Sequence, residues 1–445
     1  MSSVSTNPAN GPRAEFLVAA DQIGRQLCSQ AIWHEGRCNW IGALPEEGRG
    51  GMVVDAYTNL KGDLYGGTAG VAIFLANLYR ATGEVVARET ALGAIRQALA
   101  RADGTMPPST RGLYGGRPGL ALAAAWVGSL LSQDSLVELA PRLLDGVRAV
   151  AGTDSREYDL IAGAAGGLVG CLIVGDITGT PGLAVQASDL GDELLKSAHK
   201  ADRGWSWSSP TFPTSGDLTG FSHGAAGVGY ALLELDRVTG DGRYRDGAEQ
   251  AFKYERGLFD ATVRNWPDLR QTRHASNGRG SHSYATFWCH GAPGIGLSRL
   301  RAFQLLGDDR YIEEAEAALE TTRRWVAAEI DTRTANYSIC HGLAGCAEVL
   351  LFGETVLGAA AGEGARLAIR VAELGISCYP QRGLPWPCGT QGGESPGLFL
   401  GLAGIGLFYL RLVDPTIPSV LLPTGEAFHT LVAGRSPLIT AAAVE

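Results

Sequence analysis

The sequence predicts an all-α fold, an α/α toroid of seven helical-hairpin repeats with seven inner and seven outer helices. Three observations lead to this prediction. A glycine-rich phrase recurs seven times along the chain. An apolar segment of helical length follows each phrase, and a more amphipathic segment follows that one after a short turn. Self-similarity of this kind is typical of repeat architectures, so it indicates the fold class before any single helix is considered.

The seven phrases share an apolar first residue and a closing glycine. The spacing between closing glycines ranges from 47 residues, between Gly119 and Gly166, to 67 residues, between Gly227 and Gly294. Each interval leaves room for a helical hairpin. The seven copies are Leu64–Gly70, Leu113–Gly119, Leu160–Gly166, Phe221–Gly227, Trp288–Gly294, Ile339–Gly345 and Leu398–Gly404.

The two helical segments of a repeat differ in polarity. Residues 71–80 and 228–238 directly follow a phrase and are largely apolar, whereas residues 85–100 and 311–330 carry a polar stripe. A helix that is apolar on all sides must be surrounded by protein, but an amphipathic helix can face water. The economical arrangement is therefore two concentric rings, closed so that no repeat is left without a neighbour.

The glycines of a phrase let the chain turn tightly as it enters each inner helix. Because every phrase begins an inner helix, all seven helix N-termini should point toward the same end of the ring. Helix N-termini carry partial positive charge, so this mouth should favour a developing anion. The longer intervals leave room for loops at the rim, residues 201–218 and 260–284, which are either ordinary surface loops or covers of the mouth.

The composition argues against nucleic acid as the main partner. The formal charge is -9 and the pI is about 5.5, whereas phosphate binding needs a basic face. One local basic stretch, made of Arg270, Arg273, His274, Arg279 and His282, is interpreted as a solvated loop. Hydrophobic residues form 45% of the chain, which is ample for a large core.

The chain is expected to form a single toroid domain over residues 14–422, between a disordered N-terminus at 1–13 and a C-terminal tail at 423–445. Eight cysteines in a chain without a signal peptide indicate a reducing compartment rather than a disulfide framework. No segment approaches the roughly 18 to 20 uncharged apolar residues of a membrane helix. We therefore expect a soluble cytoplasmic protein without stable membrane insertion.

Two of the phrases contain a cysteine followed by a histidine, Cys289 with His290 and Cys340 with His341. Thiolate and imidazole are the ligands that a tetrahedral zinc ion selects. We interpret the two phrases as opposite walls of one metal site, although the pattern alone does not say which side chain of each pair reaches the ion. A buried thiol beside a packed ring would explain either copy alone, but it explains the duplication poorly.

These phrases resemble the lanthionine synthetase C-like (LanC) cyclases. The resemblance rests on Trp288–Gly294, on Cys340–Gly345, on the glycine phrases and on the ending Ser395–Gly406, and it covers nearly all of the chain from about Asp63 to Leu422. The two cysteine phrases together are quite specific, whereas the glycine phrases alone would be weak. The resemblance implies an α/α toroid around a catalytic zinc ion, in agreement with the hairpins inferred above.

Carried over to this sequence, the resemblance implies that Cys289, Cys340 and His341 bind Zn²⁺ and that His223 and Asp159 are the acid/base pair. The chain departs from some bacterial members at Ala285, where they carry an arginine four residues before the first ligand. That departure puts a carried-over arginine role in doubt. No dehydratase or kinase domain precedes the repeats, so we expect a freestanding enzyme that acts on a dehydrated precursor peptide. A partner dehydratase is a further expectation.

Three protein ligands would leave the fourth tetrahedral position for water or substrate. A substrate cysteine there would lose its proton, and its thiolate would suit conjugate addition to dehydroalanine or dehydrobutyrine. The resulting enolate needs a proton on carbon. His223 occupies the slot that His290 and His341 occupy in their own phrases, so we expect it to be the donor rather than a hydrogen-bonded core histidine.

Asp159 lies three residues before the corresponding slot and could orient or charge an imidazole. It could also simply cap an inner helix. Asp63 holds the equivalent place in the first phrase, which shows that such an aspartate need not be catalytic. His290 follows one metal ligand, and we expect it to hydrogen-bond near the metal or to touch the substrate.

Three alternatives remain beside a thioether-forming peptide cyclase. The same site could add glutathione or another small thiol to dehydrated residues of proteins. A carbohydrate-active toroid could use Asp63 and Asp159 as paired carboxylates. A non-enzymatic scaffold would be stabilised by a closed zinc site with His290 as the fourth ligand.

Overall fold

The computed structural model describes residues 12–47, 53–107, 110–148, 156–213, 215–270, 283–332, 335–358, 362–389 and 393–428. Most of the expected N-terminal segment 1–13 and most of the expected tail 423–445 therefore lie outside the described residues, and the boundaries of the single domain stay a prediction. In the described part, no helix combines the length and the apolar character needed to cross a membrane. All eight cysteines are described, and each is a free thiol.

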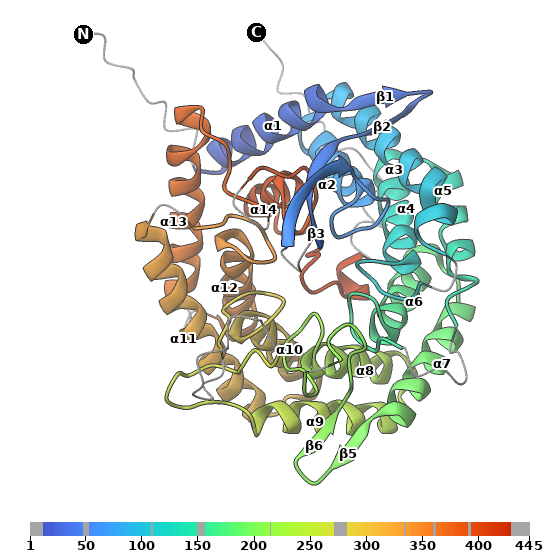
Figure 1. Cartoon of the computed structure of the whole chain (residues 1–445), viewed down its shortest axis with the longest axis vertical. Helices are drawn as coiled ribbons and strands as arrows, with labels where there is room; N and C mark the ends of the chain where they lie inside the picture. Colours follow the sequence, from blue (N-terminus) through green and yellow to red (C-terminus); the bar gives the residue numbers. More distant parts are fainter. Residues whose placement is uncertain are drawn as a thin grey trace.

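The helices form two concentric rings, which confirms the predicted toroid (Figure 1). Each inner helix packs against the next around the circle, and the last packs against the first. The inner helices are α2 (Thr68–Thr82), α4 (Arg117–Leu131), α6 (Ala164–Thr178), α8 (Ala225–Thr239), α10 (Ala292–Leu306), α12 (Leu343–Leu357) and α14 (Leu402–Val413). The outer helices are α1 (Pro12–Gln30), α3 (Val85–Thr105), α5 (Asp134–Leu139), α7 (Gly182–Ser197), α9 (Gly242–Arg256), α11 (Asp309–Thr332) and α13 (Glu363–Cys378).

The two rings differ in burial as their sequences predict. Every residue of α2 from Thr68 to Leu78 is buried, whereas α11 buries only one face, with Ala315, Leu319 and Val326 among its buried residues. An all-round apolar helix is stable only inside protein, and an amphipathic helix covers it from the solvent side. The inner ring is thus enclosed by the outer ring.

The seventh hairpin is completed from the other end of the chain. The repeat pattern predicts an outer helix after each inner helix, but α14 is followed by an irregular segment, and α1 packs against α14 in that place. Phe16 of α1 is fully buried, and its ring centroid lies 6.0 Å from that of Tyr409 in α14. The N-terminal helix therefore closes the outer ring beside the C-terminal repeat.

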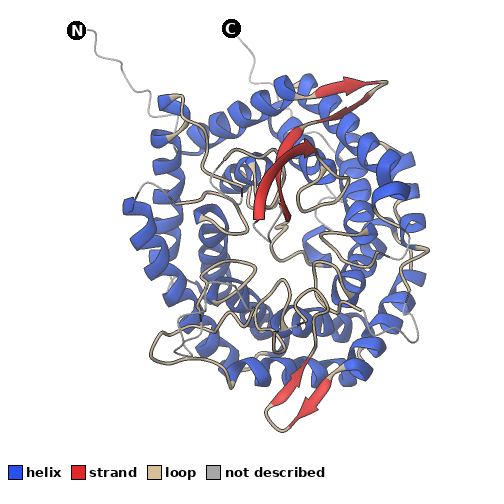
Figure 2. Ribbon diagram, in the orientation of Figure 1, coloured by secondary structure: helices blue, strands red, loops and turns tan. Residues whose placement is uncertain are grey.

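The described residues also form three short antiparallel hairpins, which the all-α prediction did not include (Figure 2). They are β1 (Ile32–His34) with β2 (Arg37–Asn39), β3 (Ile41–Glu47) with β4 (Val53–Asn59), and β5 (His199–Ala201) with β6 (Gly204–Ser206). The β3–β4 pair is in register from Ile41 opposite Asn59 to Glu47 opposite Val53. In the view of Figure 2 this pair lies across the centre of the ring.

The seven phrases are joined into a closed circle by backbone hydrogen bonds. In each case an N–H near the start of one phrase donates to a carbonyl of the next phrase, and the seventh phrase donates to the first. The bonds run from Leu64 N to Tyr114 O (3.1 Å), Leu113 N to Leu160 O (2.9 Å), Leu160 N to Ser222 O (3.2 Å), Ser222 N to Cys289 O (3.2 Å), Trp288 N to Cys340 O (3.1 Å), Cys340 N to Phe399 O (3.0 Å) and Phe399 N to Tyr65 O (2.8 Å). Buried backbone groups ahead of a helix need partners, and here the neighbouring repeat supplies them. The circle gathers the seven inner-helix N-termini at one end of the toroid, as predicted.

The closing glycine of each phrase is required by close backbone approach. A Cβ atom at Gly345 would lie 1.8 Å from the carbonyl oxygen of Ile339, and one at Gly70 would lie 2.4 Å from that of Leu64. The other five closing glycines would place a Cβ between 1.9 and 2.2 Å from the equivalent oxygen. The closing glycines therefore serve the tight turn through their lack of a side chain and not through a left-handed conformation. The glycine preceding α10 is different, because Gly291 has a φ of 86°.

A buried carboxylate of the outer ring holds the fourth phrase in place. Glu255 of α9 accepts hydrogen bonds from the N–H groups of Gly220 (2.8 Å) and Ala226 (3.0 Å). Its other oxygen pairs with Arg299 of α10 at 3.1 Å, and both side chains are fully buried. Because Gly220 and Ala226 flank His223, this contact between the rings sets the position of that histidine.

Candidate metal centre and active site

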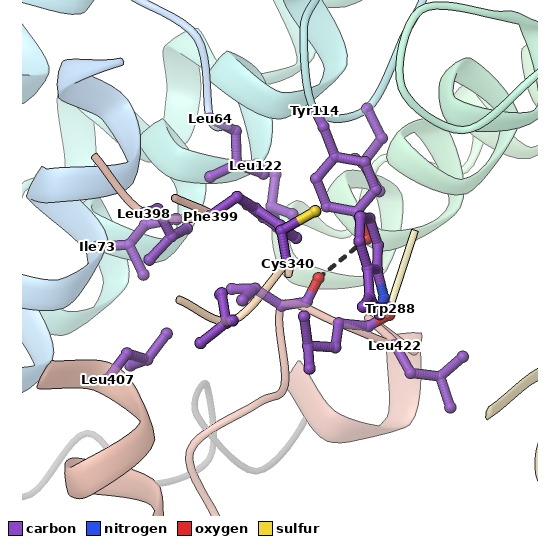
Figure 3. Close-up of a cluster of buried hydrophobic side chains, with 14 of the residues drawn as sticks. Leu64, Ile73, Tyr114, Leu122, Trp288, Cys340, Leu398, Phe399, Leu407 and Leu422 are labelled. Carbon is purple, nitrogen blue, oxygen red and sulfur yellow. Dashed lines mark hydrogen bonds between the residues drawn. The ribbon is translucent and has the colours of Figure 1, made fainter. Parts of the chain in front are cut away.

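Two neighbouring phrases bring two thiols and an imidazole together. One potential ligand atom from each of Cys289, Cys340 and His341 lies within 4.8 Å of the others. The bond from Trp288 N to Cys340 O links the two phrases at this point, and Figure 3 shows Cys340 between Phe399 and Trp288. Cys289 and Cys340 are 6% and 1% exposed, so water has little access to either sulfur.

The protonation of the two thiols fits a cation at this place. The pKa of Cys289 lies well below its ordinary value, because Cys340 donates a hydrogen bond to its sulfur and His341 lies close, which together outweigh burial. The pKa of Cys340 is raised well above its ordinary value by burial and by the neighbouring sulfur. A divalent cation bound here would neutralise both thiolates. Two sulfurs and one imidazole are also a donor set that suits zinc.

His290 is not part of the ligand group. Among the residues that the structure describes, Cys289, Cys340 and His341 form that group alone. A zinc ion held by three protein ligands has the open coordination of a catalytic site, so the closed scaffold with His290 as fourth ligand is not favoured. His290 instead stacks on His223, with ring centroids 5.7 Å apart. Burial lowers the pKa of His290 to about 4, so its imidazole is neutral, and its buried Nε2 has no hydrogen-bond partner among the described residues.

His223 and Asp159, which the sequence predicts as an acid/base pair, are in direct contact. His223 Nδ1 lies 2.6 Å from Asp159 Oδ2. A carboxylate accepts, so Nδ1 carries the proton toward Asp159 and Nε2 is left for another partner. Burial alone would lower the pKa of His223, but the hydrogen bond and the charge of Asp159, helped by Cys289, raise it above the ordinary value.

Both oxygens of the Asp159 carboxylate have a hydrogen-bond partner. Its Oδ1 accepts a hydrogen bond of 2.7 Å from the N–H of Ala162, in the turn before α6. Asp63 makes the equivalent contact in the first phrase, where its Oδ1 accepts from Gly66 at 2.8 Å. The two aspartates differ at the second carboxylate oxygen, because Oδ2 of Asp159 faces His223.

The two predicted rim loops contact each other beside His223. Phe212, from the loop at 201–218, lies edge-on to His223 with ring centroids 5.5 Å apart. Arg270, from the loop at 260–284, lies over Phe212 at 5.9 Å and makes a two-point ion pair with Asp268, at 3.0 and 2.7 Å. The described parts of the two loops therefore meet above the site.

The interpretation of the basic stretch as solvated is wrong for Arg270, which is largely buried; its other four residues lie outside the described residues. Burial alone would lower the pKa of Arg270, but Asp268 and then the sulfurs of Cys289 and Cys340 raise it. Arg270 thus brings positive charge toward the sulfurs, although Ala285 stands where some bacterial family members carry arginine.

Tyr65 is a residue of the site that sequence reasoning missed. Its hydroxyl donates a hydrogen bond of 3.0 Å to the sulfur of Cys340, and its ring stacks on Phe399 with centroids 4.9 Å apart. Burial and the nearby sulfurs raise the pKa of Tyr65 well above its ordinary value, so the hydroxyl keeps its proton. A signal was present, because Tyr65 is the second residue of its phrase, the slot that Cys289 and Cys340 occupy in theirs.

Comparison with known proteins identifies the family. The chain matches the model of the lanthionine synthetase C-like protein family over residues 58–422. This match covers most of its length, and the chain belongs to that family.

The individual relatives and solved structures share little sequence identity with the chain. The chain is 26% identical over 129 residues to a glutathione S-transferase, LANCL1, of Danio rerio, a match that spans 29% of this chain and 28% of that relative's length. Among solved structures, nisin cyclase has a TM-score of 0.60 at 18% identity, covering 84% of this chain and 93% of the cyclase, and this similarity supports the fold. A family 76 glycoside hydrolase from Bacteroides thetaiotaomicron has a TM-score of 0.46 at 13% identity, covering 89% and 77%, and we draw nothing from it.

Proposed function

We propose that this protein is a zinc-dependent lanthionine-forming cyclase. It adds cysteine thiols of a ribosomally made, dehydrated precursor peptide to dehydroalanine or dehydrobutyrine, and the products are thioether rings. One observation carries the proposal: the Cys289, Cys340 and His341 group lies beside a hydrogen-bonded His223–Asp159 pair at the mouth of a toroid. Membership of the lanthionine synthetase C-like family supports it.

Cys289, Cys340 and His341 would hold the zinc ion. When bound, zinc would keep a substrate thiol in its thiolate form at neutral pH and hold it in the fourth position. The burial of both cysteines keeps water away from this place, which strengthens electrostatic interactions there.

His223 would donate the proton that completes the addition. The sulfur attacks the β-carbon of the dehydroamino acid, the double-bond electrons move toward the carbonyl oxygen, and His223 Nε2 protonates the α-carbon of the enolate. The net reaction adds S–H across C=C, so the proton lost by the thiol balances the one that His223 gives. Asp159 keeps His223 charged and orients its ring through the 2.6 Å contact.

The enolate is negative, and positive charge surrounds the site. The inner helices direct their N-termini to this end of the toroid, and Arg270, which is paired with Asp268, lies at the rim loops. A mouth of this polarity stabilises the developing anion more than it stabilises a neutral substrate.

The test uses a peptide with one cysteine and one dehydroalanine, together with three variants. Cyclisation does not change the mass of the peptide. Ring formation is therefore detected as loss of the free thiol, because a cysteine in a thioether ring no longer reacts with N-ethylmaleimide. We expect Cys340→Ala to lose both bound zinc and cyclisation. We expect His223→Ala to keep zinc and to lose about 10²- to 10⁴-fold in rate, the usual contribution of a general acid. Cys346→Ala is the control, because Cys346 is equally buried but lies outside the ligand group. Full cyclisation by metal-free Cys340→Ala would refute the proposal.

A second candidate function is addition of glutathione to dehydrated residues in proteins. The name of the Danio rerio relative favours it, although that match covers 28% of the relative. A dehydrated peptide without cysteine, incubated with glutathione, separates the two functions. A glutathione adduct that depends on Cys340 would favour the second function, and its absence beside efficient ring formation would favour the first.

Two other expectations gain no support from these observations. A dehydratase partner and a cytoplasmic location stay predictions.

The carbohydrate-active alternative based on Asp63 and Asp159 is not favoured, because one Asp159 oxygen is engaged by His223 and Asp63 caps its own turn.

A further inference from the structure

Tyr65 and Tyr114 allow the same side chain to be compared in two neighbouring repeats. Both are the second residue of their phrase, after Leu64 and Leu113. Both rings contact Phe399, with centroids 4.9 and 4.8 Å from its ring. Their backbones are joined directly, since Tyr65 N donates to Tyr114 O at 3.0 Å. The two tyrosines thus share a partner ring, although Tyr65 stacks on Phe399 and the fully buried Tyr114 meets it edge-on.

Their hydroxyl groups differ in acceptor. Tyr114 Oη donates to the backbone carbonyl of Val420 at 2.9 Å, a contact that joins the phrase circle to the C-terminal segment. Tyr65 Oη donates at 3.0 Å to the sulfur of Cys340. The Tyr114 bond satisfies a backbone carbonyl and so serves the stability of the fold. The Tyr65 bond instead reaches Cys340, which belongs to the group of side chains that could hold a metal ion.

We propose that Tyr65 is a positioning residue of the metal centre, which holds and tunes the Cys340 sulfur through its hydroxyl. The inference rests on the proposed metal site. A hydrogen bond to a thiolate draws electron density away from the sulfur and fixes its direction. A bound cation would then receive less charge from Cys340 and would hold a substrate thiolate more firmly. The stack on Phe399 restricts the Tyr65 ring and so keeps its hydroxyl aimed at the sulfur.

Cobalt(II) tests this inference, because its thiolate charge-transfer band reports electron density on the sulfur directly. The full-length chain and the variants Tyr65→Phe and Tyr114→Phe are each freed of metal and titrated with Co²⁺, and then with Zn²⁺ against a chelator. Phenylalanine keeps the ring stack and removes only the hydroxyl. For Tyr65→Phe we expect the band to move to lower energy, because the sulfur regains electron density. We expect metal affinity to fall about 10-fold, because the direction of the sulfur is no longer fixed. For Tyr114→Phe we expect the wild-type band and affinity, even if its stability falls.

A second substitution strengthens the same donor. Replacement of Tyr65 by 3-fluorotyrosine makes the hydroxyl more acidic, so the band should move to higher energy than in the wild type. This arm remains informative if Tyr65→Phe does not fold. The inference is overturned if both changes at position 65 leave the band where the wild type has it while Co²⁺ still binds. A wild-type chain that binds neither Co²⁺ nor Zn²⁺ would instead overturn the proposed metal centre, and the role of Tyr65 with it.

Discussion

At the scale of single residues, the second and third positions of each phrase carry the chemistry. Tyr65, Cys289 and Cys340 hold the second position, and His223 and His341 hold the third. The sequence predicts which residue types are present at these positions. It does not say which of them meet, because the partners lie on different repeats.

The Asp159–His223 contact gives a pH prediction. Asp159 raises the pKa of His223, and a proton donor is active only while protonated, so activity should fall as pH rises through that pKa. In Asp159→Asn, burial dominates and lowers the pKa. We therefore expect the alkaline limb of the plot of kcat against pH to move to lower pH. At pH values above this limb, kcat should fall about 10-fold for each unit by which the pKa of His223 is lowered.

The control for this prediction is Asp63→Asn. Asp63 occupies the same place in the first phrase and makes the same turn contact, but its described hydrogen bond is to Gly66 rather than to a histidine. Its profile should keep the wild-type limb. If Asp159→Asn also kept that limb, the role of Asp159 would be limited to its contact with the turn before α6.

At the scale of elements, the phrase glycines decide whether an inner helix can begin. Each closing glycine faces the carbonyl six residues earlier at a distance that excludes a side chain. The repetition of glycine is evident in the sequence, but its reason is visible only in the structure. Among the glycines that directly precede the inner helices, Gly291 has a left-handed backbone with a positive φ. The other six have negative φ values.

Gly70→Ala tests this requirement. The new methyl group would lie 2.4 Å from Leu64 O and 2.6 Å from the Leu398 side chain, so the first and seventh phrases would have to move apart. We expect a loss of about 1–3 kcal/mol in the free energy of unfolding, measured by urea denaturation. Gly66→Ala is the matched control in the same phrase, because a methyl group at that position would have no neighbouring atom within 4 Å. Equal stability of the two variants would show that the close approach is not limiting.

At the scale of the whole molecule, α1 makes the ring complete. The sequence predicts seven hairpins, and seven inner helices follow the phrases in the described part. The sequence pattern does not reveal that the seventh outer helix precedes the first phrase. Helix α1 shares no phrase with α14, and their pairing depends on the ring bringing the two ends of the chain together.

Phe16→Ala tests ring closure. Phe16 is fully buried between α1 and α14, so its truncation should cost about 3–5 kcal/mol of global stability if the outer ring folds as one unit. Val18→Ala, at a position 55% exposed on the same helix, should change stability by less than about 0.5 kcal/mol. Chemical denaturation followed by circular dichroism measures both. A negligible effect of Phe16→Ala would mean that α1 is an accessory helix.

The sequence by itself determined the repeat number, the alternation of buried and amphipathic helices, and a duplicated thiol and imidazole pair, because these are local patterns that each repeat carries in its own residues. These local patterns do not say which members of those pairs meet; the family resemblance implied a ligand set, and the contacts themselves come from the tertiary structure. It placed Cys289 with Cys340 and His341, left His290 against His223, gave Tyr65 to Cys340 and brought Arg270 over the site. These contacts join repeats that are far apart in the chain, and they exist only because the phrases are hydrogen-bonded into one closed circle.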